Sequence, residues 1–530
     1  MNADSLLITV VFSVDTKEYA VPGANIKNLN LELLDSGFKG TFDFLISDEN
    51  GKDELYKVLG KSSPVYITIS YKSYTYNSKV ESEETTLKGI VTEREIREIQ
   101  FDDLKKSAVL LRDYRISFTD TARFFWSQHF PCEIYVNKSL KDVITSQVID
   151  PISLDIQWDY LEQEKPLICL SMGPCQISFY DFLVDYITGN CGYFLYDYKT
   201  NSYKITGEKE KCKEKYSPLP HQVADVTVLY EKTSFDSINV LNAQHENAST
   251  TSVSINKKIN GIKKDTLIIT PFAKEVEAQK NLETKKAAAA KPGLRFSMRQ
   301  FPLKTLVPGS GICFTSKTWN TKLLFFNKNY RTKAVFLRLK ACDQGAAHNQ
   351  NLDFTEFNLD MTVLNEDADN QGFPPFMPDQ HSCYVEGLIV SDAGDKNDKT
   401  YQYTTNDSTK QHEYRVSIPL WNTEIKVLYH PDFLNPHFYF PLYRDTPVLL
   451  ELTLFSARIV RILDWGKNVF IDQENQGNQI LFGKNTKDET AMKYQYEDNK
   501  PVFSIERTKE KDTGLFRMEE GTMILETKEE

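Results

Sequence analysis

Short runs in which apolar and polar residues alternate recur along most of this chain. Residues 29–33, 42–46, 65–71 and 112–118 follow the pattern, and Asp35-Ser36-Gly37 supplies a turn between the first two. A period of two places alternate side chains on one face of a strand, which is typical of half-buried β-strands. Aromatic residues, which pack well on pleated sheets, make up 12% of the chain. Several short strands at this spacing predict a small β-barrel.

A chain of 530 residues is too long for one ordinary core. We predict a mainly β protein with an α/β insert, divided into five parts. They are a first β-barrel at 1–136, the α/β insert at 137–215, a second β-barrel at 216–364, an oligonucleotide/oligosaccharide-binding-type (OB-fold) barrel at 379–464, and a segment of short strands at 465–530.

Helical patterns are concentrated in the insert. Residues 139–148 and 178–187 each follow a serine that can cap a helix, and the second run has an amphipathic stripe. Residues 192–206 predict a hairpin. The charged, Ala-rich run at 274–291 predicts a solvated helix or a mobile excursion.

Strand patterns return in the second half of the chain. Residues 322–326 and 334–339 predict strands of the second barrel, and residues 365–378 predict a linker. The OB-type barrel is predicted from strands at 383–390 and 446–452, with others between them.

The last part repeats one pattern of short strands separated by polar turns. The strands are predicted at 469–472, 479–483, 501–505, 514–518 and 522–526. Few of them could bury a face inside a monomer, and a repeated unit that cannot bury its own face needs neighbours. Three copies of the chain could wrap around a shared apolar axis.

Charge and hydropathy exclude several classes of protein. The chain has 63 basic and 74 acidic residues, a net charge of −11, which argues against a general binder of nucleic acid or anionic membranes. We find no apolar run near the ~20 residues of a membrane helix and no Sec-type signal. The eight cysteines show no Cys-x-x-Cys spacing, which favours reduced thiols in a protein assembled in the cytoplasm.

Motifs for catalysis or metal binding are not evident. The eight histidines form neither His-Glu-x-x-His nor His-x-His, and His381 near Cys383 is more typical of a loop than of a metal site. Pro308-Gly309-Ser310-Gly311 is predicted as a turn rather than a nucleotide loop. We therefore predict no catalytic, cofactor-binding or metal-binding residue, no cofactor, and a protein that is not an enzyme.

Residues 176–183, which include Asp181, are followed along the middle of the chain by Gly192-Tyr193-Phe194-Leu195-Tyr196. This part of the chain resembles the hub segment of VgrG-type proteins and phage baseplate hubs. In that family a strand leads to a helix with an Asp-x-x-Phe-x-x-Arg-Leu pattern, followed by a glycine-aromatic strand and a hairpin. The match at residue level covers residues 87 to 206. Its segments are 87–91, 114–118, 130–135, 139–144, 169–170, 176–183, 192–196 and 203–206.

The resemblance implies a mechanical role. A protein of this family is a homotrimeric hub and spike of a contractile injection system, with two hub β-barrel domains per chain that seat a hexameric inner-tube protein. The implied partners are baseplate proteins, a PAAR-like tip protein and possible effector cargo, without nucleic acid. The C-terminal segment would be a short trimeric β-helix or prism, and the particle or virion would be delivered outward after cytoplasmic assembly.

Some features depart from the family pattern and leave alternatives open. Asp185-Tyr186 occupies the position of an Arg-Leu pair in the family helix. Type VI secretion, an extracellular injection particle and a phage tail remain alternatives. A carbohydrate-binding or carbohydrate-active β-protein, or an adhesin or scaffold, are the other hypotheses.

Overall fold

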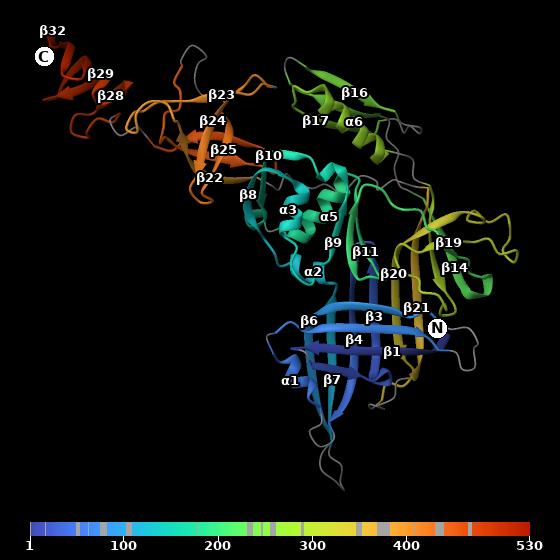
Figure 1. Cartoon of the computed structure of the whole chain (residues 1–530). Coiled ribbons are helices and arrows are strands. Elements are labelled where there is room, and N and C mark those ends of the chain that lie inside the picture. The colour runs from blue at the N-terminus through green and yellow to red at the C-terminus, as the bar shows by residue number, and fades with distance from the viewer. Residues whose placement is uncertain are drawn as a thin grey trace. The chain divides into compact units, whose positions relative to one another are not determined.

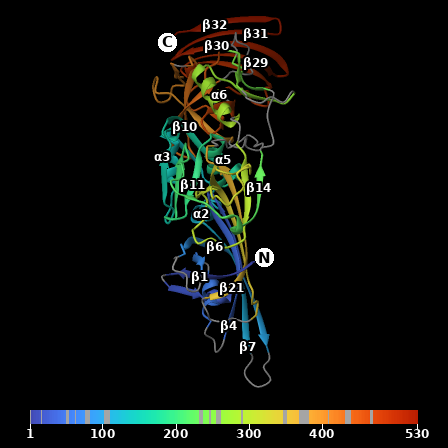
Figure 2. The same cartoon turned by 90° about the vertical axis from the view of Figure 1, so that its right-hand side faces the viewer.

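The structure is a computed structural model, shown in two views in Figures 1 and 2. It describes residues 2–15, 17–48, 53–61, 63–74, 82–101, 109–175, 177–230, 237–244, 247–254, 261–287, 291–345, 352–367, 382–407, 409–429, 439–464 and 469–529. The fold is mainly β, with 54% strand and 12% helix, as predicted. The chain divides into two compact units. Unit 1 contains 1–130, 141–163 and 177–377, and unit 2 contains 131–140, 164–176 and 378–530.

The largest sheet lies in unit 1 and closes on itself. Eight strands pair in the order β20-β3-β4-β7-β6-β5-β1-β21, and β20 also pairs with β21, which completes a ring. A closed ring leaves no strand edge exposed. The eight strands are β1 (Asn2–Val14), β3 (Ile26–Leu34), β4 (Gly37–Asp48), β5 (Tyr66–Ser73), β6 (Thr85–Phe101), β7 (Val109–Thr119), β20 (Asn329–Ala341) and β21 (Leu352–Asn365).

Aromatic side chains fill the interior of this ring. Phe12, Phe42, Phe44, Tyr114 and Phe118 are all fully buried. The rings of Phe44 and Tyr114 stack with centroids 4.7 Å apart, and Phe42 lies 5.3 Å from Phe44. The period-two pattern of the sequence thus reflects strands whose inward side chains are large and flat.

Apart from those within residues 237–268, the strands from residues 215–365 join the same sheet. At one end of the β20–β21 hairpin, β20 pairs with β3 and β21 pairs with β1. At the other end, β20 pairs with β19 and β21 pairs with β18. The two regions predicted as separate barrels therefore share strands. The predicted division into five domains stays a prediction. The remaining strands are β2 (Lys17–Val21), β13 (Lys215–Tyr216), β14 (Val223–Leu229), β18 (Gly293–Met298) and β19 (Gly311–Cys313).

The predictions for the strands of this region have mixed outcomes. The strand predicted at 334–339 is confirmed within β20. The strand predicted at 322–326 is wrong, because these residues form turns. Phe325 is buried there by an aromatic cluster, with its ring 4.8 Å from that of Phe314 and 5.5 Å from that of Trp319. The apolar run therefore serves tertiary packing rather than a strand.

The helical insert forms much as predicted. Helix α5 begins after Ser178, whose side-chain oxygen accepts from the Asp181 N–H at 3.1 Å. The predicted hairpin is β11 and β12, and β9 pairs with β12 in parallel. The helices and strands here and nearby are α1 (Leu55–Leu59), α2 (Thr121–Trp126), α3 (Leu140–Ser146), β9 (Leu154–Gln157), α4 (Met172–Cys175), α5 (Phe179–Gly189), β11 (Tyr193–Asp197) and β12 (Ser202–Thr206), with short 3-10 turns η1 (Gly23–Asn25), η2 (Asp159–Leu161) and η3 (Pro220–Gln222).

A small three-stranded sheet and one helix form a separate element of unit 1. The charged run predicted as a solvated helix or a mobile excursion is the helix α6 (Ala273–Ala287), which lies on this sheet. Its strands are β15 (Ser237–Asn242), β16 (Ser249–Val253) and β17 (Lys263–Ile268). Across the part of the chain that the structure describes, no helix has the length and apolarity to span a membrane. The predicted linker at 365–378 lies outside the described residues beyond Asp367.

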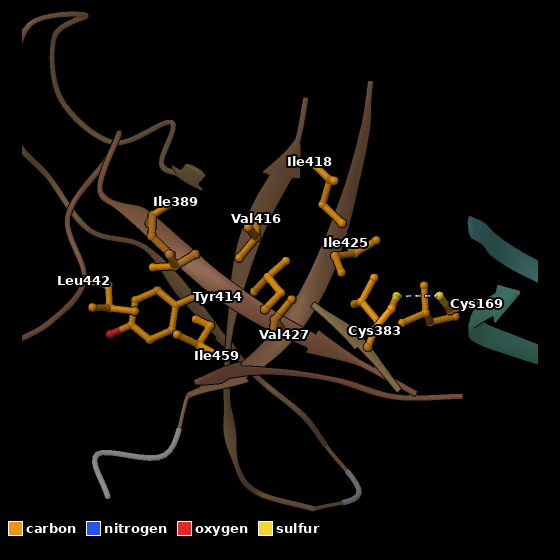
Figure 3. Close-up of a cluster of buried hydrophobic side chains, with 14 residues drawn as sticks. Cys169, Cys383, Ile389, Tyr414, Val416, Ile418, Ile425, Val427, Leu442 and Ile459 are labelled. Carbon is orange, nitrogen blue, oxygen red and sulfur yellow. Dashed lines mark hydrogen bonds between the residues drawn. The ribbon is translucent and has the colours of Figure 1, made fainter. Parts of the chain in front are cut away.

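Unit 2 contains a closed five-stranded barrel in the region predicted at 379–464. Its strands pair in the ring β22-β24-β25-β27-β26, and β23 extends β24. The antiparallel pair of β8 and β10 contributes Leu167 and Cys169 to the barrel's core, and Figure 3 shows Cys169 there. The strands are β8 (Cys132–Ser139), β10 (Glu164–Ser171), β22 (Cys383–Val390), β23 (Tyr403–Thr405), β24 (His412–Ile418), β25 (Thr423–Tyr429), β26 (Pro447–Leu452) and β27 (Ala457–Ile462).

The chain ends in a five-stranded antiparallel meander, also in unit 2, that we call the C-terminal sheet. The strands predicted at 479–483, 501–505, 514–518 and 522–526 are confirmed, whereas residues 469–472 form no strand. The strands are β28 (Gly477–Asn485), β29 (Asp488–Glu497), β30 (Lys500–Lys509), β31 (Asp512–Glu519) and β32 (Thr522–Lys528).

A buried ion cluster ties the loop after β4 to the ring. Arg112 donates to Asp48 at 2.9 Å and to Asp53 at 3.0 Å, and its guanidinium lies 4.0 Å from the centre of the Tyr56 ring. The Tyr114 hydroxyl also donates to Asp53, at 2.5 Å. Burial and this contact with a carboxylate raise the pKa of Tyr114.

Replacing Arg112 should destabilise unit 1 strongly. Arg112→Met leaves two buried carboxylates without their cation, which costs about 3–5 kcal/mol. Arg115→Met removes an exposed arginine of the same strand, whose ion pairs with Asp43 and Glu95 are worth at most about 1 kcal/mol. Thermal and urea unfolding measure both. Equal losses would contradict this account of the cluster.

Candidate functional site

The described residues hold no obvious reaction centre. They contain no group of three or more His, Cys, Asp or Glu side chains arranged to hold a metal ion. His381 lies outside the described residues, and Cys383 is buried in the barrel core of unit 2. Surfaces that could bind a partner are therefore the candidates.

One hollow of about 840 Å³ lies in unit 1 against the large sheet and α2. Some of its charged residues have partners: Lys39 pairs with Glu32 at 2.9 Å, and Glu93 accepts from Ser117 at 3.1 Å. Phe336, 37% exposed, adds an apolar wall. Such a mixed surface suits recognition more than chemistry.

The C-terminal sheet carries an apolar face. Its register aligns one residue from each strand in a single row across the sheet. That row is Ile480, Met492, Ile505, Phe516 and Leu525.

A second apolar row lies beside the first on the same face. Because side chains alternate along a strand, residues two positions away share the face. This row is Tyr494, Phe503, Met518 and Met523. We call the two rows together the apolar face.

The apolar face remains open within one chain. Leu525 is 78% exposed and Met523 63% exposed, and Ile480 and Met518 are also exposed. The opposite face carries ion pairs beside apolar residues such as Val502: Arg517 donates to Glu497 at 2.6 Å, and Lys493 pairs with Glu506. The sheet thus turns its apolar side to solvent in the isolated chain, the reverse of what a stable monomer would do.

An aromatic patch lies on the barrel of unit 2. Tyr401 and Tyr403 stack nearly parallel, 8° apart, and Tyr401 meets the rings of Tyr439 and Tyr443 edge-on. The ring of His412 lies 4.3 Å from that of Tyr403. Burial and the contact with Tyr401 raise the pKa of Tyr439. The sequence analysis did not identify this patch; Tyr401-Gln402-Tyr403 was the only local signal.

Arginine 444 fixes the loop that leads to this patch. Its guanidinium donates to the backbone oxygens of Ser391 at 2.6 Å, Ala393 at 2.7 Å and Asp395 at 2.8 Å. These carbonyls belong to the segment just before Tyr401. The contacts with Arg444 therefore order the aromatic patch in the absence of a ligand.

A buried carboxylate in unit 1 connects β4, α2 and β12. Asp120 caps α2 by accepting from the Arg123 N–H at 2.9 Å, and it also accepts from the Phe38 N–H and the Tyr203 hydroxyl, at 3.0 and 2.6 Å. Burial raises its pKa, and these donors oppose that shift. Gly37 has a φ of +138°, and a Cβ there would lie 2.3 Å from the Asp120 carboxylate.

Adding a side chain at Gly37 should therefore disrupt this junction. Gly37→Ala both strains the backbone and displaces Asp120, at a cost of about 2 kcal/mol or more. Gly189→Ala is a matched control, because nothing lies within 4 Å of its Cβ position. Differential scanning fluorimetry should show a lower melting temperature only for Gly37→Ala; an unchanged value would contradict the close packing described.

Comparison with known proteins identifies a shared fold. In sequence, no family model and no curated protein matches the chain. In structure, the chain is similar to a chain of the PdpA-VgrG complex in its lidless form, with a TM-score of 0.76, 15% identity, and coverage of 100% of this chain and 99% of the other. The lidded and half-lidded Francisella PdpA-VgrG complexes give TM-scores of 0.75 and 0.74 at 15% identity, covering 100% of this chain and 80% and 88% of those chains. The chain therefore has the fold of a PdpA-VgrG complex component.

Proposed function

We propose that this chain is a structural hub and spike of a contractile injection system and works as a homotrimer. Its trimer would adapt a hexameric inner tube to a pointed tip that pierces a target membrane, with baseplate proteins, a PAAR-like tip protein and possible cargo as partners. The barrel of unit 2 would be its OB-fold domain. The role is mechanical rather than enzymatic, and the particle is assembled in the cytoplasm and then delivered outward.

The apolar face of the C-terminal sheet is the observation that supports this proposal most. Nine apolar side chains share that face, and several are exposed in the single chain. Burying such side chains against other copies yields about 25 cal/mol per Å² of apolar surface. Threefold packing would place the three faces around one axis and remove them from water together. The likeness to a component of the PdpA-VgrG complex supports the same role.

Adjacent residues of β32 offer a sharp test, because they point to opposite faces. Leu525→Asp places a charge on the apolar face, whereas Ile524→Asp places one opposite Arg517 on the other face. Leu525 is so exposed that the substitution should leave the folded chain intact. We expect Leu525→Asp to weaken trimer formation at least about tenfold, measured by light scattering across a dilution series, and Ile524→Asp to behave as wild type.

Two outcomes of this comparison would overturn the proposal. One is a wild-type chain of single-chain mass, 61.1 kDa, at micromolar concentration. The other is a trimer that tolerates both substitutions equally. Circular dichroism on both variants confirms that the sheet still forms.

The aromatic patch favours carbohydrate binding as a second candidate function. Barrels of the OB type bind oligosaccharides, and stacked, preordered tyrosines offer flat apolar surfaces with hydroxyl groups at their rims. A role of this kind is compatible with a hub, since a particle that crosses cell envelopes meets glycans.

Titration with an N-acetylglucosamine hexamer tests this second function. We expect binding by the wild-type chain and a loss of at least about tenfold in affinity for the double variant Tyr401→Ala, Tyr403→Ala, measured by calorimetry. Tyr384→Ala is the control, because Tyr384 is 60% exposed and contacts Glu451 instead. No binding by the wild type, or equal loss in the control, would reject the patch as a glycan site.

A further inference from the structure

Two thiols that are distant in sequence meet in the core of unit 2. Cys169 on β10 and Cys383 at the start of β22 have their sulfur atoms 3.9 Å apart, across 214 residues of chain. Figure 3 shows the two side chains pointing toward one another at one side of the buried cluster. Cys169 is fully buried, and Cys383 is 6% exposed.

Backbone hydrogen bonds on both sides hold this contact. The Cys169 N–H donates to the Leu454 carbonyl at 2.9 Å, and Cys169 also lies opposite Ile134 in the β8–β10 pair. Cys383 lies opposite Leu452 in the pairing of β22 with β26. Leu452 and Leu454 belong to one short stretch, so the same turn region positions both thiols.

We propose that Cys169 and Cys383 form an intrachain disulfide when the protein meets a small-molecule disulfide such as oxidised glutathione. The Cys383 thiolate attacks one sulfur of the oxidant, releases one glutathione thiolate, and forms a mixed disulfide. The Cys169 sulfur then attacks Cys383, giving its proton to a released thiolate and expelling the second glutathione. The two cysteines are oxidised, and one oxidised glutathione is reduced to two thiols.

The electrostatics of the pair agree with this order. The contact with Cys169 lowers the pKa of Cys383. The same contact, together with burial, raises the pKa of Cys169. Cys383 is also the less buried of the two, and a lower pKa and greater access both favour it as the attacking thiol.

The bridge would join the β8–β10 pair to the barrel through a covalent bond. In the chain-entropy model, closing a loop of this length stabilises the folded state substantially. The place where the disulfide would form rests on the proposed function. A particle assembled in the reducing cytoplasm and then delivered outward passes into oxidising surroundings. The bond would then strengthen the hub after it leaves the cell.

Peptide mapping tests the bridge directly. The full-length protein is incubated with oxidised glutathione, unfolded, alkylated and digested. We expect a Cys169–Cys383 linked peptide, while Cys191 and Cys313, which are also buried, are alkylated completely. The melting transition should rise by about 5 °C or more and return after reduction.

Three variants separate this bridge from other thiol chemistry. Cys169→Ser and Cys383→Ser should each abolish the linked peptide and the shift in melting temperature, whereas Cys132→Ser, at the exposed cysteine of β8, should keep both. Complete alkylation of Cys169 and Cys383 in the oxidised wild type, or a bridge from Cys383 to Cys132, would overturn the proposal. Light scattering on the same samples distinguishes failure of the trimer proposal from failure of the disulfide proposal. A single-chain mass would count against the trimer and not against the disulfide.

Discussion

The constraint on which this account depends is the apolar face of the C-terminal sheet. Its first row crosses all five strands in register, and its second crosses four and ends at Met523, which is 63% exposed. A five-stranded meander has only two faces, and the opposite one carries ion pairs such as that of Arg517 with Glu497. The proposed trimer would remove the apolar face from water.

Two closed sheets elsewhere in the chain enclose their own apolar side chains. The ring in unit 1 encloses Phe12, Phe42 and Phe44, and the barrel in unit 2 encloses Val416 and Leu450. Closed sheets of this kind leave few edges to pair with foreign strands. In the C-terminal sheet, β28 and β32 each pair with one described strand only.

Much of the local structure could be predicted from the sequence. Ser178 and the stripe behind it predicted α5, and the strands of the C-terminal sheet followed from their alternation and polar turns. Tertiary packing explains the exceptions, since Phe325 is buried by Phe314 and Trp319 in a turn.

The candidate surfaces were harder to predict, because they depend on contacts between distant segments. The need for neighbours was visible in the repeated strands, but the alignment of Ile480 with Leu525 requires the register of four hairpins. Nothing local marks the meeting of Cys169 with Cys383. Tyr401 and Tyr443 likewise come together only when the barrel closes.

A cryo-electron microscopy map of the purified full-length protein would test the central claim most directly. The account predicts threefold symmetry, with the rows that contain Phe516 and Leu525 from three chains packed around the axis. A map in which this face of the C-terminal sheet contacts only solvent, or in which the chain is solitary, would contradict it.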